Sequence, residues 1–543
     1  IILCAGKIDP SNLPIGTNVS NATIPVNGKP VIAWILDDLM CKQVYDVIVV
    51  AREEDKKLQK LLTRVYAKKM QITIACVSEP KSILESLSAG LEQVKENAVQ
   101  VILGDTLIRD SFDFENDTVY VGEVKETKRW CLAIADHRHR LVELIDKQDY
   151  KNHSYQALAG YYFFTDTAWL KDCVERSRKH GEKELSAAIR LYMQKRPIQT
   201  CKVEEWYDFG HIDNLLQAKQ RLLRPRYFNQ LKVNPVLKTI SKVSDDTEKL
   251  ADELNWYLQL PDELKVLTPR ILHQEYHSSK IEIVQEYYGY PTLAELYVYS
   301  DFHHENWQSI LRHILKIHQE FRRYTTTMPN EVIFDMYVKK TEQRLNLLQQ
   351  SDPFWKEVLQ RREIIYNGKI YENFWSLKAV VLSLIEEMQK DFAPCVMHGD
   401  LCFSNILYDV ANQIVKIIDP RGSFGRKGIY GDPRYDMAKL RHSVAGLYDF
   451  MVADMFQVNE DKDGFTGEIF DIQPVEKIIA DFDQLLEENG YNVLHIKLIE
   501  GLLFISMLPL HRDHPKRQLM MFLTGIARLN EVKECRSQLL AKL

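Results

Sequence analysis

Residues 398–405 read His-Gly-Asp-Leu-Cys-Phe-Ser-Asn, and an apolar run follows that ends at Asp419. Asp400 and Asn405 lie in a predicted tight loop, and a short hairpin separates them from Asp419, which closes a strand. An aspartate in such a loop can accept the proton of an attacking hydroxyl, while an amide and a second carboxylate can hold Mg²⁺ on nucleotide phosphates. The alternative is a polar hairpin between buried strands. In that case three residue types and two spacings would match the pattern of a phosphoryl-transfer site by chance. The stretch therefore predicts a site for phosphoryl transfer.

The size and composition of the chain describe an ordinary globular protein. At 543 residues it is too long for one hydrophobic core, so two or more domains are expected. Its contents of 45% hydrophobic and 27% charged residues are typical of such proteins. A net charge of −6 gives no general reason to expect a nucleic acid or an anionic membrane as partner. The nine cysteines are scattered without a Cys-x-x-Cys pair, which favours a reducing compartment and argues against disulfides or a zinc site.

The hydropathy of the chain predicts no transmembrane helix. No apolar run approaches the ~20 residues needed to cross a bilayer, and the richest run, residues 499–510, contains Glu500. No signal peptide is visible before the first predicted strand at residues 1–4. The cytoplasm is therefore the expected location.

The first ~220 residues alternate short β-rich runs with amphipathic helical segments. Residues 31–40 and 54–66 have the helical pattern, and residues 216–223 are predicted as a terminal helix. The apolar runs between them are expected to be buried parallel strands. These runs are residues 1–4, 47–50, 72–76 and 99–103. The alternation predicts an α/β sheet with helices on both faces.

The character of the chain changes after about residue 224. A β-rich stretch at residues 228–243 precedes a predicted helix at residues 247–258, and a further strand is predicted at residues 281–287. From about His304 onward helical patterns dominate. A small β-rich lobe followed by a larger helical lobe indicates an α+β domain with two lobes.

This change places the border between two domains near residues 220–227. The predicted domains are residues 1–223 and residues 224–543. We expect the second to consist of a small lobe at about 224–300 and a helical large lobe at about 301–543. Neither an internal repeat nor a low-complexity segment interrupts either domain.

Residues 431–438, Gly-Asp-Pro-Arg-Tyr-Asp-Met-Ala, complete a second pattern in the C-terminal domain. Together with residues 398–405 and Asp419, this pattern resembles the motifs of the aminoglycoside phosphotransferase and choline kinase superfamily. The resemblance implies a bilobal protein-kinase-like fold that uses ATP and Mg²⁺ to phosphorylate a small molecule. The chain lacks the Ala-Pro-Glu of protein-kinase activation segments, so a protein substrate is not expected.

The same resemblance assigns roles to single residues. Asp400 matches the catalytic base, and Asn405 and Asp419 match the residues that bind Mg²⁺. Asp436 matches a residue that commonly braces the catalytic loop. His398 is expected to orient that loop without taking part in the chemistry.

A kinase-like small lobe should supply a lysine for the nucleotide phosphates and a helix glutamate to hold it. Lys238 and Lys242 lie an even number of residues apart on one predicted strand, so both would point to the same face. Lys242 directly precedes the helical segment that contains Glu253. We therefore predict Lys242 and Glu253 as the nucleotide-binding pair. The alternative is that each is a solvated charge.

The N-terminal domain carries four spaced motifs of its own. They are Ile-Leu-Cys-Ala-Gly at residues 2–6, Ile-Pro-Val-Asn-Gly-Lys-Pro at 24–30, Leu-Gly-Asp at 103–105 and Trp-Tyr-Asp-Phe-Gly at 206–210. Together they resemble the sugar-phosphate nucleotidyltransferases, a family with a Rossmann-like fold. The resemblance implies attack of a phosphate oxygen on the α-phosphorus of an NTP, with pyrophosphate as leaving group. Negative charge develops on both sides, and a metal ion and backbone N–H groups must neutralise it.

Asp105 and Asp208 match the metal ligands of that family. Two aspartates that cap neighbouring helices are the alternative. By the same resemblance Gly6, Lys29 and Ser82 are expected to bind the nucleotide: Gly6 in the turn after the first strand, Lys29 near the phosphates, and Ser82 at the start of the helix that contacts the base.

The N-terminal domain departs from the family pattern at two places. After Ala-Gly the family has Gly-x-Gly-Thr-Arg, whereas residues 7–12 here read Lys-Ile-Asp-Pro-Ser-Asn. The usual lysine before the Pro-Val-x-Gly-Lys-Pro run is replaced by Asn21. Lys7 is a candidate for the missing cation.

Together the two resemblances imply a bifunctional enzyme. The C-terminal domain would phosphorylate a small alcohol, amino alcohol or sugar with ATP. The N-terminal domain would then transfer a nucleoside monophosphate to that product, giving an activated precursor for surface polysaccharide. Analogy with choline kinase fused to phosphocholine cytidylyltransferase favours CTP as the second NTP, and a hexose or hexosamine with another NTP is the closest competitor. The alternative is a kinase with a non-catalytic, nucleotide-binding N-terminal domain that regulates it or forms a scaffold.

Overall fold

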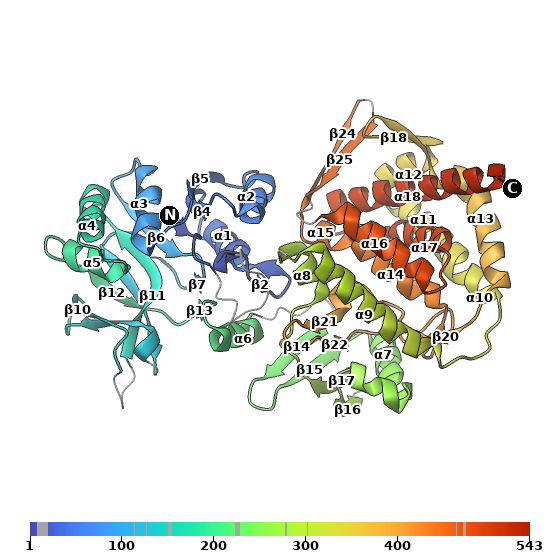
Figure 1. Ribbon diagram of the computed structural model, residues 1–543, viewed down its shortest axis with the longest axis horizontal. Coiled ribbons are helices and arrows are strands. Elements are labelled where there is room, and N and C mark those ends of the chain that lie inside the picture. The colour runs from blue at the N-terminus through green and yellow to red at the C-terminus, as the bar shows by residue number, and fades with distance from the viewer. Residues whose placement is uncertain are drawn as a thin grey trace. The chain divides into compact units, whose positions relative to one another are not determined.

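The computed structural model of the 543-residue chain describes all residues except 8–19, 113, 126, 150–154, 223–228, 277–279, 301, 463, 471–473 and 543. The chain divides into two compact units (Figure 1). The first consists of Ile1–Leu222 with Tyr299–Asp301, and the second of Leu223–Val298 with Phe302–Leu543. The predicted border at residues 223 and 224 lies outside the described residues.

A nine-stranded mixed sheet forms the centre of the first unit. Its strands β6, β1, β4 and β5 are parallel neighbours in that order, which confirms the four predicted parallel strands. Strand β11 continues the sheet antiparallel to β6 and pairs with β8 and β9. The nine strands are β1 (Ile2–Leu3), β4 (Asp46–Arg52), β5 (Gln71–Val77), β6 (Val99–Leu103), β8 (Thr118–Val124), β9 (Cys131–Ala135), β10 (Leu141–Asp146), β11 (Tyr155–Phe164) and β12 (Gln199–Lys202).

Helices of this unit occupy the predicted segments. The predicted helix at 31–40 is α1, and the segment at 54–66 forms α2 followed by a π-helical turn at Leu62–Tyr66. The predicted terminal helix at 216–223 is α6, which begins earlier than expected; Leu223 lies outside the described residues. The helices are α1 (Val31–Cys41), α2 (Lys56–Leu61), α3 (Ile83–Glu92), α4 (Thr167–Lys179), α5 (Leu185–Tyr192) and α6 (Ile212–Arg221).

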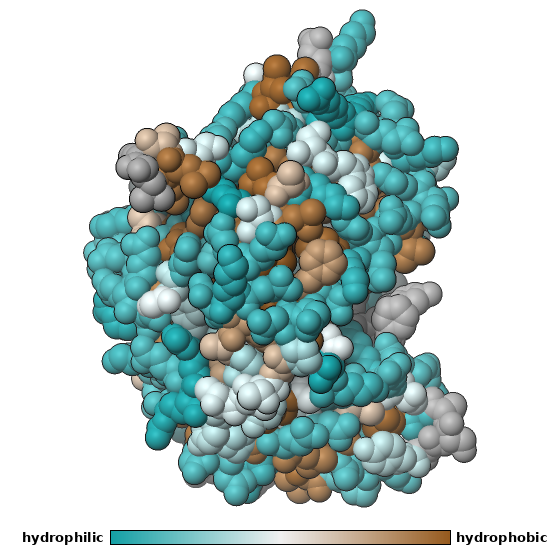
Figure 2. Space-filling view, turned by 90° about the vertical axis from the view of Figure 1, so that its right-hand side faces the viewer, coloured by the Kyte–Doolittle hydropathy of each residue, from teal (hydrophilic) through white to brown (hydrophobic). Residues whose placement is uncertain are grey.

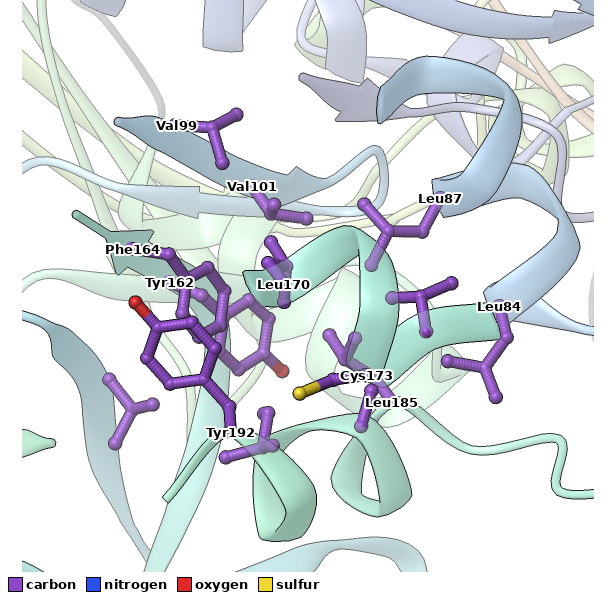
Figure 3. Close-up of a cluster of buried hydrophobic side chains, with 14 of the residues drawn as sticks. Leu84, Leu87, Val99, Val101, Tyr162, Phe164, Leu170, Cys173, Leu185 and Tyr192 are labelled. Atoms are coloured by element: carbon purple, nitrogen blue, oxygen red, sulfur yellow. The ribbon is translucent and has the colours of Figure 1, made fainter. Parts of the chain in front are cut away.

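The hydrophobic core of the first unit lies where α3, α4 and α5 meet β6 and β11 (Figure 3). Leu87 of α3 and Leu170 of α4 are fully buried beside Val101 of β6 and Phe164 of β11. The buried face of each helix follows from apolar residues spaced three or four apart, which form one stripe. This core fixes β6, whose last residues lead into the Leu-Gly-Asp motif.

Gly104 allows the ends of β1 and β6 to meet. A Cβ at Gly104 would lie 2.7 Å from the carbonyl oxygen of Leu3 and 2.9 Å from Cys4 Sγ. Such contacts are too short, so any side chain there would push the two strand ends apart. The close approach brings Asp105, just after β6, to the same edge of the sheet as the turn that contains Gly6.

The small lobe of the second unit is a four-stranded antiparallel sheet with one helix packed on it. Leu250 and Leu254 of α7 are buried against Ile281 and Ile283 of β17. The helix predicted at 247–258 and the strand predicted at 281–287 are confirmed. The elements are β14 (Asn229–Asn234), β15 (Thr239–Ser244), α7 (Thr247–Gln259), β16 (Ile271–Tyr276) and β17 (Ile281–Glu286), with sheet order β14-β15-β17-β16.

The prediction that Lys238 and Lys242 share a strand is wrong. Lys238 lies in the turn before β15 with a φ of 52°. The side chain of Asn234 accepts hydrogen bonds from the backbone N–H groups of Val236 and Leu237, each at 3.0 Å, and so shapes this turn. Lys242 is within β15 and is buried.

Helices make up most of the rest of the second unit, as predicted from about His304 onward. Two short antiparallel strand pairs interrupt them: β20 (Cys395–Val396) with β23 (Tyr430–Gly431), and the hairpin of β21 (Ile406–Asp409) with β22 (Ile414–Ile417). A further small sheet contains β18 (Glu363–Tyr366), β19 (Lys369–Glu372), β24 (Phe456–Asp461) and β25 (Gly464–Ile469). The main helices are α9 (His304–Arg322), α11 (Lys340–Ser351), α12 (Pro353–Gln360), α13 (Phe374–Lys390), α14 (Pro433–Val444), α16 (Val475–Glu488), α17 (Val493–Ser506) and α18 (Pro515–Lys542).

Glu500, the one charge in the richest apolar run, is fully buried in α17. It forms an ion pair with Arg441 of α14, and its other carboxylate oxygen lies 3.3 Å from Arg528 Nε of α18. Arg441 also donates to Asp483 of α16 at 2.8 Å. A buried charge must be paired, so this cluster ties four helices of the large lobe together.

The surface of the protein is mixed. On the face drawn in Figure 2, hydrophilic residues predominate and hydrophobic residues are scattered among them, which is ordinary for a water-facing surface. Among the described residues, the helices include none whose length and apolar content suffice for a membrane span. All nine cysteines, each of them described, are free thiols.

Candidate active sites

A cavity of about 660 Å³ opens in the first unit at the carboxyl ends of its parallel strands. Its walls include residues 3–7, which end and follow β1, and residues 79–83, which lead into α3. In open α/β sheets, ligands bind outside the carboxyl ends of the strands. The predicted residues Gly6, Ser82 and Asp105 all line this cavity.

The structure brings Asp105 and Asp208 together. Strand β13 (Trp206–Asp208) pairs with β7 (Thr106–Ile108), which sets Asp208 opposite Thr106. Both carboxylates lie against Gly210, where a Cβ would be 3.0 Å from Asp105 Oδ2 and 3.4 Å from Asp208 Oδ1. The two predicted metal ligands thus converge although they are far apart in the sequence.

The charges around Asp105 favour a cation. Burial raises the pKa of Asp105, and the nearby charge of Asp208 raises it further, while the side-chain amide of Asn21 donates to Asp105 Oδ2 at 3.1 Å. No group of three or more His, Cys, Asp and Glu side chains within the described ranges could hold a metal. Two converging carboxylates therefore fit a Mg²⁺ ion that takes its other ligands from nucleotide phosphates and water.

Asp208 is held by the start of α6. Its Oδ2 accepts a hydrogen bond from the Asn214 amide at 2.7 Å and lies 3.0 Å from His211 Nδ1. The hydrogen bond with Asp208 raises the pKa of His211. These partners fix the direction of the Asp208 carboxylate.

Ser82 caps α3 at the cavity wall. Its Oγ accepts the backbone N–H of Glu85 at 3.3 Å, so the helix begins at the cavity wall. Such an N-terminus attracts a phosphate or another anion. At Gly6 a Cβ would approach the side chain of Asn21 to 3.5 Å, an ordinary contact, so its small size leaves room for a ligand without being required by the packing.

Lys29 is not among the residues that line the cavity. Its ammonium group forms an ion pair with Asp37 of α1 and lies 4.0 Å from the ring centroid of Trp34. The structure therefore does not bring Lys29 together with Gly6, Ser82 and Asp105.

Three cations line the cavity instead. Lys7 lies 3.3 Å from Glu54, the buried Arg52 ends β4, and Lys81 directly precedes Ser82. The sequence interpretation named Lys7 but missed Arg52 and Lys81. Arg52 lies just after a predicted strand and Lys81 just before a predicted helix, and these positions could have indicated that both line the cavity. The altered residues 8–12 of the loop lie outside the described residues.

In the second unit, Lys242 contacts its expected partner Glu253 and also Asp419. Its Nζ donates to Glu253 Oε2 at 2.6 Å and to Asp419 Oδ1 at 3.1 Å. Burial lowers the pKa of Lys242, but the charges of Asp419 and Glu253 outweigh burial and the net shift is upward. Burial raises the pKa of Glu253 to about 7. Residues from a strand, a helix and a distant loop thus meet at one point.

The backbone of Asp419 is strained. It follows β22 with a φ of 56°, a left-handed conformation that residues other than glycine seldom adopt. Its N–H group donates to the hydroxyl of Tyr257 at 3.2 Å. Strained residues of this kind cluster at functional sites.

The loop of residues 398–405 places Asp400 and Asn405 side by side. Asn405 Nδ2 donates to the backbone carbonyl of Asp400 at 2.9 Å and to its Oδ2 at 3.2 Å. Gly399 has a φ of 80°, and a Cβ there would lie 2.8 Å from Arg421 Cβ, so the position between His398 and Asp400 requires glycine.

Asp436 braces this loop, as predicted. Its carboxylate accepts the backbone N–H groups of His398 at 2.7 Å and Gly399 at 2.8 Å. The ring of His398 lies between Asp400 N, 3.3 Å from Nδ1, and the carbonyl of Ile418, 3.0 Å from Nε2. Burial lowers the pKa of His398 to about 4, so the ring is neutral and links the two loops.

The predicted site residues of the second unit therefore form two adjoining groups, Lys242–Glu253–Asp419 and Asp400–Asn405. The arrangement offers a cation for nucleotide phosphates, an amide and a carboxylate that could hold Mg²⁺, and an ionised aspartate for a hydroxyl proton. These are the parts that transfer of a phosphoryl group requires.

The sequence interpretation missed three basic residues near Asp400, namely Lys340, Arg344 and Lys439. Lys439 Nζ lies 2.8 Å from Asp400 Oδ1, and the charges that act most strongly on Lys340 are Arg421, Arg344, Lys439 and Asp400. Burial would raise the pKa of Asp400, but Lys439 and, more weakly, Arg421 hold it well below its usual value. Lysines and arginines on helices usually face water, so the sequence carried no signal for these three helix residues.

We expect Lys340→Met to stabilise the protein in a pH-dependent way. Burial, then the charges of Arg421 and Arg344, lower the pKa of Lys340 from 10.5 to about 6. The unfolded chain therefore binds more protons than the folded one between these values, and the penalty from Lys340 is greatest at pH 6 and fades as the pH rises. Removing about 1 kcal/mol of penalty raises Tm by about 2 °C.

Thermal unfolding at pH 6 and pH 9 measures this effect. The matched control is Lys339→Met, because Lys339 is exposed and pairs with Asp335 at 2.5 Å. The Tm of the control variant should not rise above that of wild type at either pH. A Lys340→Met protein that is less stable than wild type at pH 6 would contradict the expectation.

Comparison with known proteins identifies the first unit. A sequence model of the family described as "Nucleotidyl transferase" matches residues 11–224. The N-terminal part of the chain is therefore a nucleotidyltransferase domain, of a class of enzymes that transfer nucleotides. Glucose-1-phosphate thymidylyltransferase from Neisseria meningitidis is 25% identical over 233 residues, which cover 40% of this chain and 80% of that protein. The enzyme of the same name from Mycolicibacterium smegmatis is 22% identical over 232 residues, with the same coverage.

Solved structures resemble the same part of the chain. CTP:phosphocholine cytidylyltransferase from Streptococcus pneumoniae is 15% identical, with a TM-score of 0.33, and covers 41% of this chain and 97% of its own. A UDP-glucose pyrophosphorylase complexed with UDP-glucose is 17% identical, with a TM-score of 0.35, and covers 40% of this chain and 96% of its own.

Proposed function

We propose that the protein is a bifunctional enzyme. The second unit phosphorylates a hydroxyl of a small molecule with ATP and Mg²⁺. The nucleotidyltransferase domain then transfers a nucleoside monophosphate from a second NTP to that phosphate and releases pyrophosphate. The product is a nucleoside-diphosphate-activated small molecule.

One observation carries the kinase half of this proposal. Lys242 contacts Glu253 and Asp419 at 2.6 and 3.1 Å, next to the loop in which Asn405 contacts Asp400. Phosphoryl transfer depends on positioning and electrostatic stabilisation, and a lysine–glutamate pair with two metal-binding residues and a base supplies both. Stability alone does not account for such a group, because buried ionic clusters contribute little net stability.

The transferase half is supported by the family match at residues 11–224 and by the convergence of Asp208 on Asp105, which lines the cavity. CTP remains the favoured second NTP on the analogy with fused choline kinase and cytidylyltransferase. The curated relatives are named thymidylyltransferases, so dTTP is the competing choice.

A two-stage assay with the whole chain tests the proposal. In the first stage, mass spectrometry follows ATP- and Mg²⁺-dependent phosphorylation over a panel of polyols, amino alcohols, hydroxy acids and sugars. In the second stage, each phosphorylated product is offered with CTP, dTTP, UTP, GTP or ATP, and pyrophosphate release is measured. We expect release with one phosphorylated product and a preferred NTP. If phosphorylation occurs but no NTP yields pyrophosphate, the N-terminal domain is a regulatory or scaffold module.

A further inference from the structure

Four basic side chains gather near Asp400: Lys439 contacts its carboxylate, the charges of Arg421 and Asp400 act on each other and on Lys340, and Arg344 acts on Lys340. Lys340 and Arg344 belong to α11, one helical turn apart, Arg421 lies in the loop after Asp419, and Lys439 belongs to α14. We call them the basic group. They come from three separate parts of the chain, and only folding brings them together.

The basic group has few negative partners. In the described part of the chain, Lys439 is its one member in contact with a carboxylate, that of Asp400 at 2.8 Å. Arg344 donates to the carbonyl of Ser506 at 2.9 Å and Arg421 to the hydroxyl of Tyr435 at 2.9 Å, both uncharged acceptors. No carboxylate described in the structure lies within ion-pair distance of Lys340.

The four basic side chains thus share one contacting carboxylate, that of Asp400, in a partly buried space. Grouping like charges away from water is unfavourable unless an anion compensates them. The pKa of Lys340, lowered to about 6 by burial and by Arg421, Arg344 and Lys439, reflects that imbalance. The fold thus maintains a costly arrangement, which favours a role in binding an anionic ligand.

The basic group differs from the cation expected at the ATP phosphates. The charges that act most strongly on Lys242 are Asp419 and Glu253, and none of the basic group is among them. The strongest charges on Lys340 include Asp400 but neither Asp419 nor Glu253. A base must lie within hydrogen-bond reach of the hydroxyl it serves, so Lys439, in contact with Asp400, and Arg421, whose charge acts on Asp400, lie near the place of an acceptor.

We propose that the phosphoryl acceptor carries an anionic group, a carboxylate or a phosphate monoester, that Lys340, Arg344 and Arg421 bind. This inference rests on the kinase function proposed above. In the reaction the acceptor hydroxyl oxygen forms a bond to the γ-phosphorus of ATP, the bond from that phosphorus to the bridging oxygen breaks, and ADP leaves. The hydroxyl proton passes to Asp400. A cationic amino alcohol is a poor acceptor in such a pocket.

Matched acceptors test the charge requirement. The whole protein with ATP and Mg²⁺ is given hydroxy acids and phosphate monoesters of polyols and sugars, each beside its neutral and its amino counterpart. We expect kcat/KM to be about tenfold or more higher for one anionic class. Preference for hydroxy acids or for phosphate monoesters identifies which anion is bound. A neutral or amino counterpart that is phosphorylated best overturns the inference but leaves the kinase function standing.

Variants test the residues. Arg344→Gln should raise KM for the preferred anionic acceptor by about 10–100-fold, because a charge-assisted hydrogen bond is lost, while KM for ATP stays unchanged. Arg344→Lys should recover part of the loss, and Lys339→Gln is the exposed control. Equal rises in both KM values would assign the basic group to ATP and overturn the inference, as would an unchanged acceptor KM. Phosphorylation of no acceptor in either assay would overturn the kinase function itself.

Discussion

Asp400→Asn is expected to lower phosphorylation of the acceptor by about a thousandfold and to leave nucleotidyl transfer unchanged. The substitution keeps the shape of the side chain but removes the negative charge that can accept the hydroxyl proton and that pairs with Lys439 at 2.8 Å. Groups that act on the transition state in this way lower the activation free energy by several kcal/mol. Phosphorylation is measured with ATP and the acceptor, and nucleotidyl transfer with the phosphorylated product supplied directly.

Asp409→Asn is the matched control for this change. Asp409 lies at the end of β21, where it accepts the backbone N–H of Ala411 at 3.0 Å, away from the loop of Asp400. Its phosphorylation rate should equal that of wild type. Thermal unfolding of both variants shows whether the chain still folds, since Asp400→Asn leaves Lys439 without its carboxylate. A folded Asp400→Asn protein that phosphorylates at the wild-type rate would remove Asp400 from the chemistry.

Asp105→Asn is expected to have the converse effect, a loss of about a thousandfold in nucleotidyl transfer with phosphorylation unchanged. One of two converging carboxylates is neutralised, so the Mg²⁺ that would balance the developing charge on the α-phosphate is held less well. The amide can keep a hydrogen bond with Asn21, which donates at 3.1 Å in the wild-type protein. Pyrophosphate release with the phosphorylated product is the measurement.

Asp110→Asn serves as the control for Asp105→Asn. Asp110 accepts the backbone N–H groups of Glu204 and Glu205, each at 2.9 Å, and is not a cavity residue. It should retain nucleotidyl transfer. If Asp105→Asn or Asp400→Asn abolishes both activities in a folded protein, the two reactions do not have separate sites.

The sequence predicted those features that depend on local pattern. The parallel strands of the first unit were predicted from apolar runs, because a strand that is buried on both faces consists mostly of consecutive apolar residues. The spacing of Lys242 and Glu253 around a strand and the following helix led to a pair that the structure brings into contact. The loop residues Asp400 and Asn405 were found because both lie in one short motif.

Features that depend on packing were not predictable. Lys29 lies in a recognisable motif, yet α1 offers Asp37 within reach and the lysine pairs with it. Lys238 and Lys242 have equivalent spacing, and a turn built by Asn234 removes Lys238 from the strand. The sequence pattern around Arg344 is that of an ordinary helix-surface residue, and only the folded lobe brings it near Arg421.

Helix α14 joins the loop of residues 398–405 to a buried cluster of ion pairs inside the second unit. Asp436 and Lys439 of this helix contact the loop of residues 398–405, and Arg441 of the same helix forms ion pairs with Asp483 and Glu500. A single helix thus connects the loop to the ion cluster. A substitution at Glu500 would remove one partner of Arg441 and let α14 move. In a screen that measures turnover alone, such a variant would look like one that has lost a residue of the site.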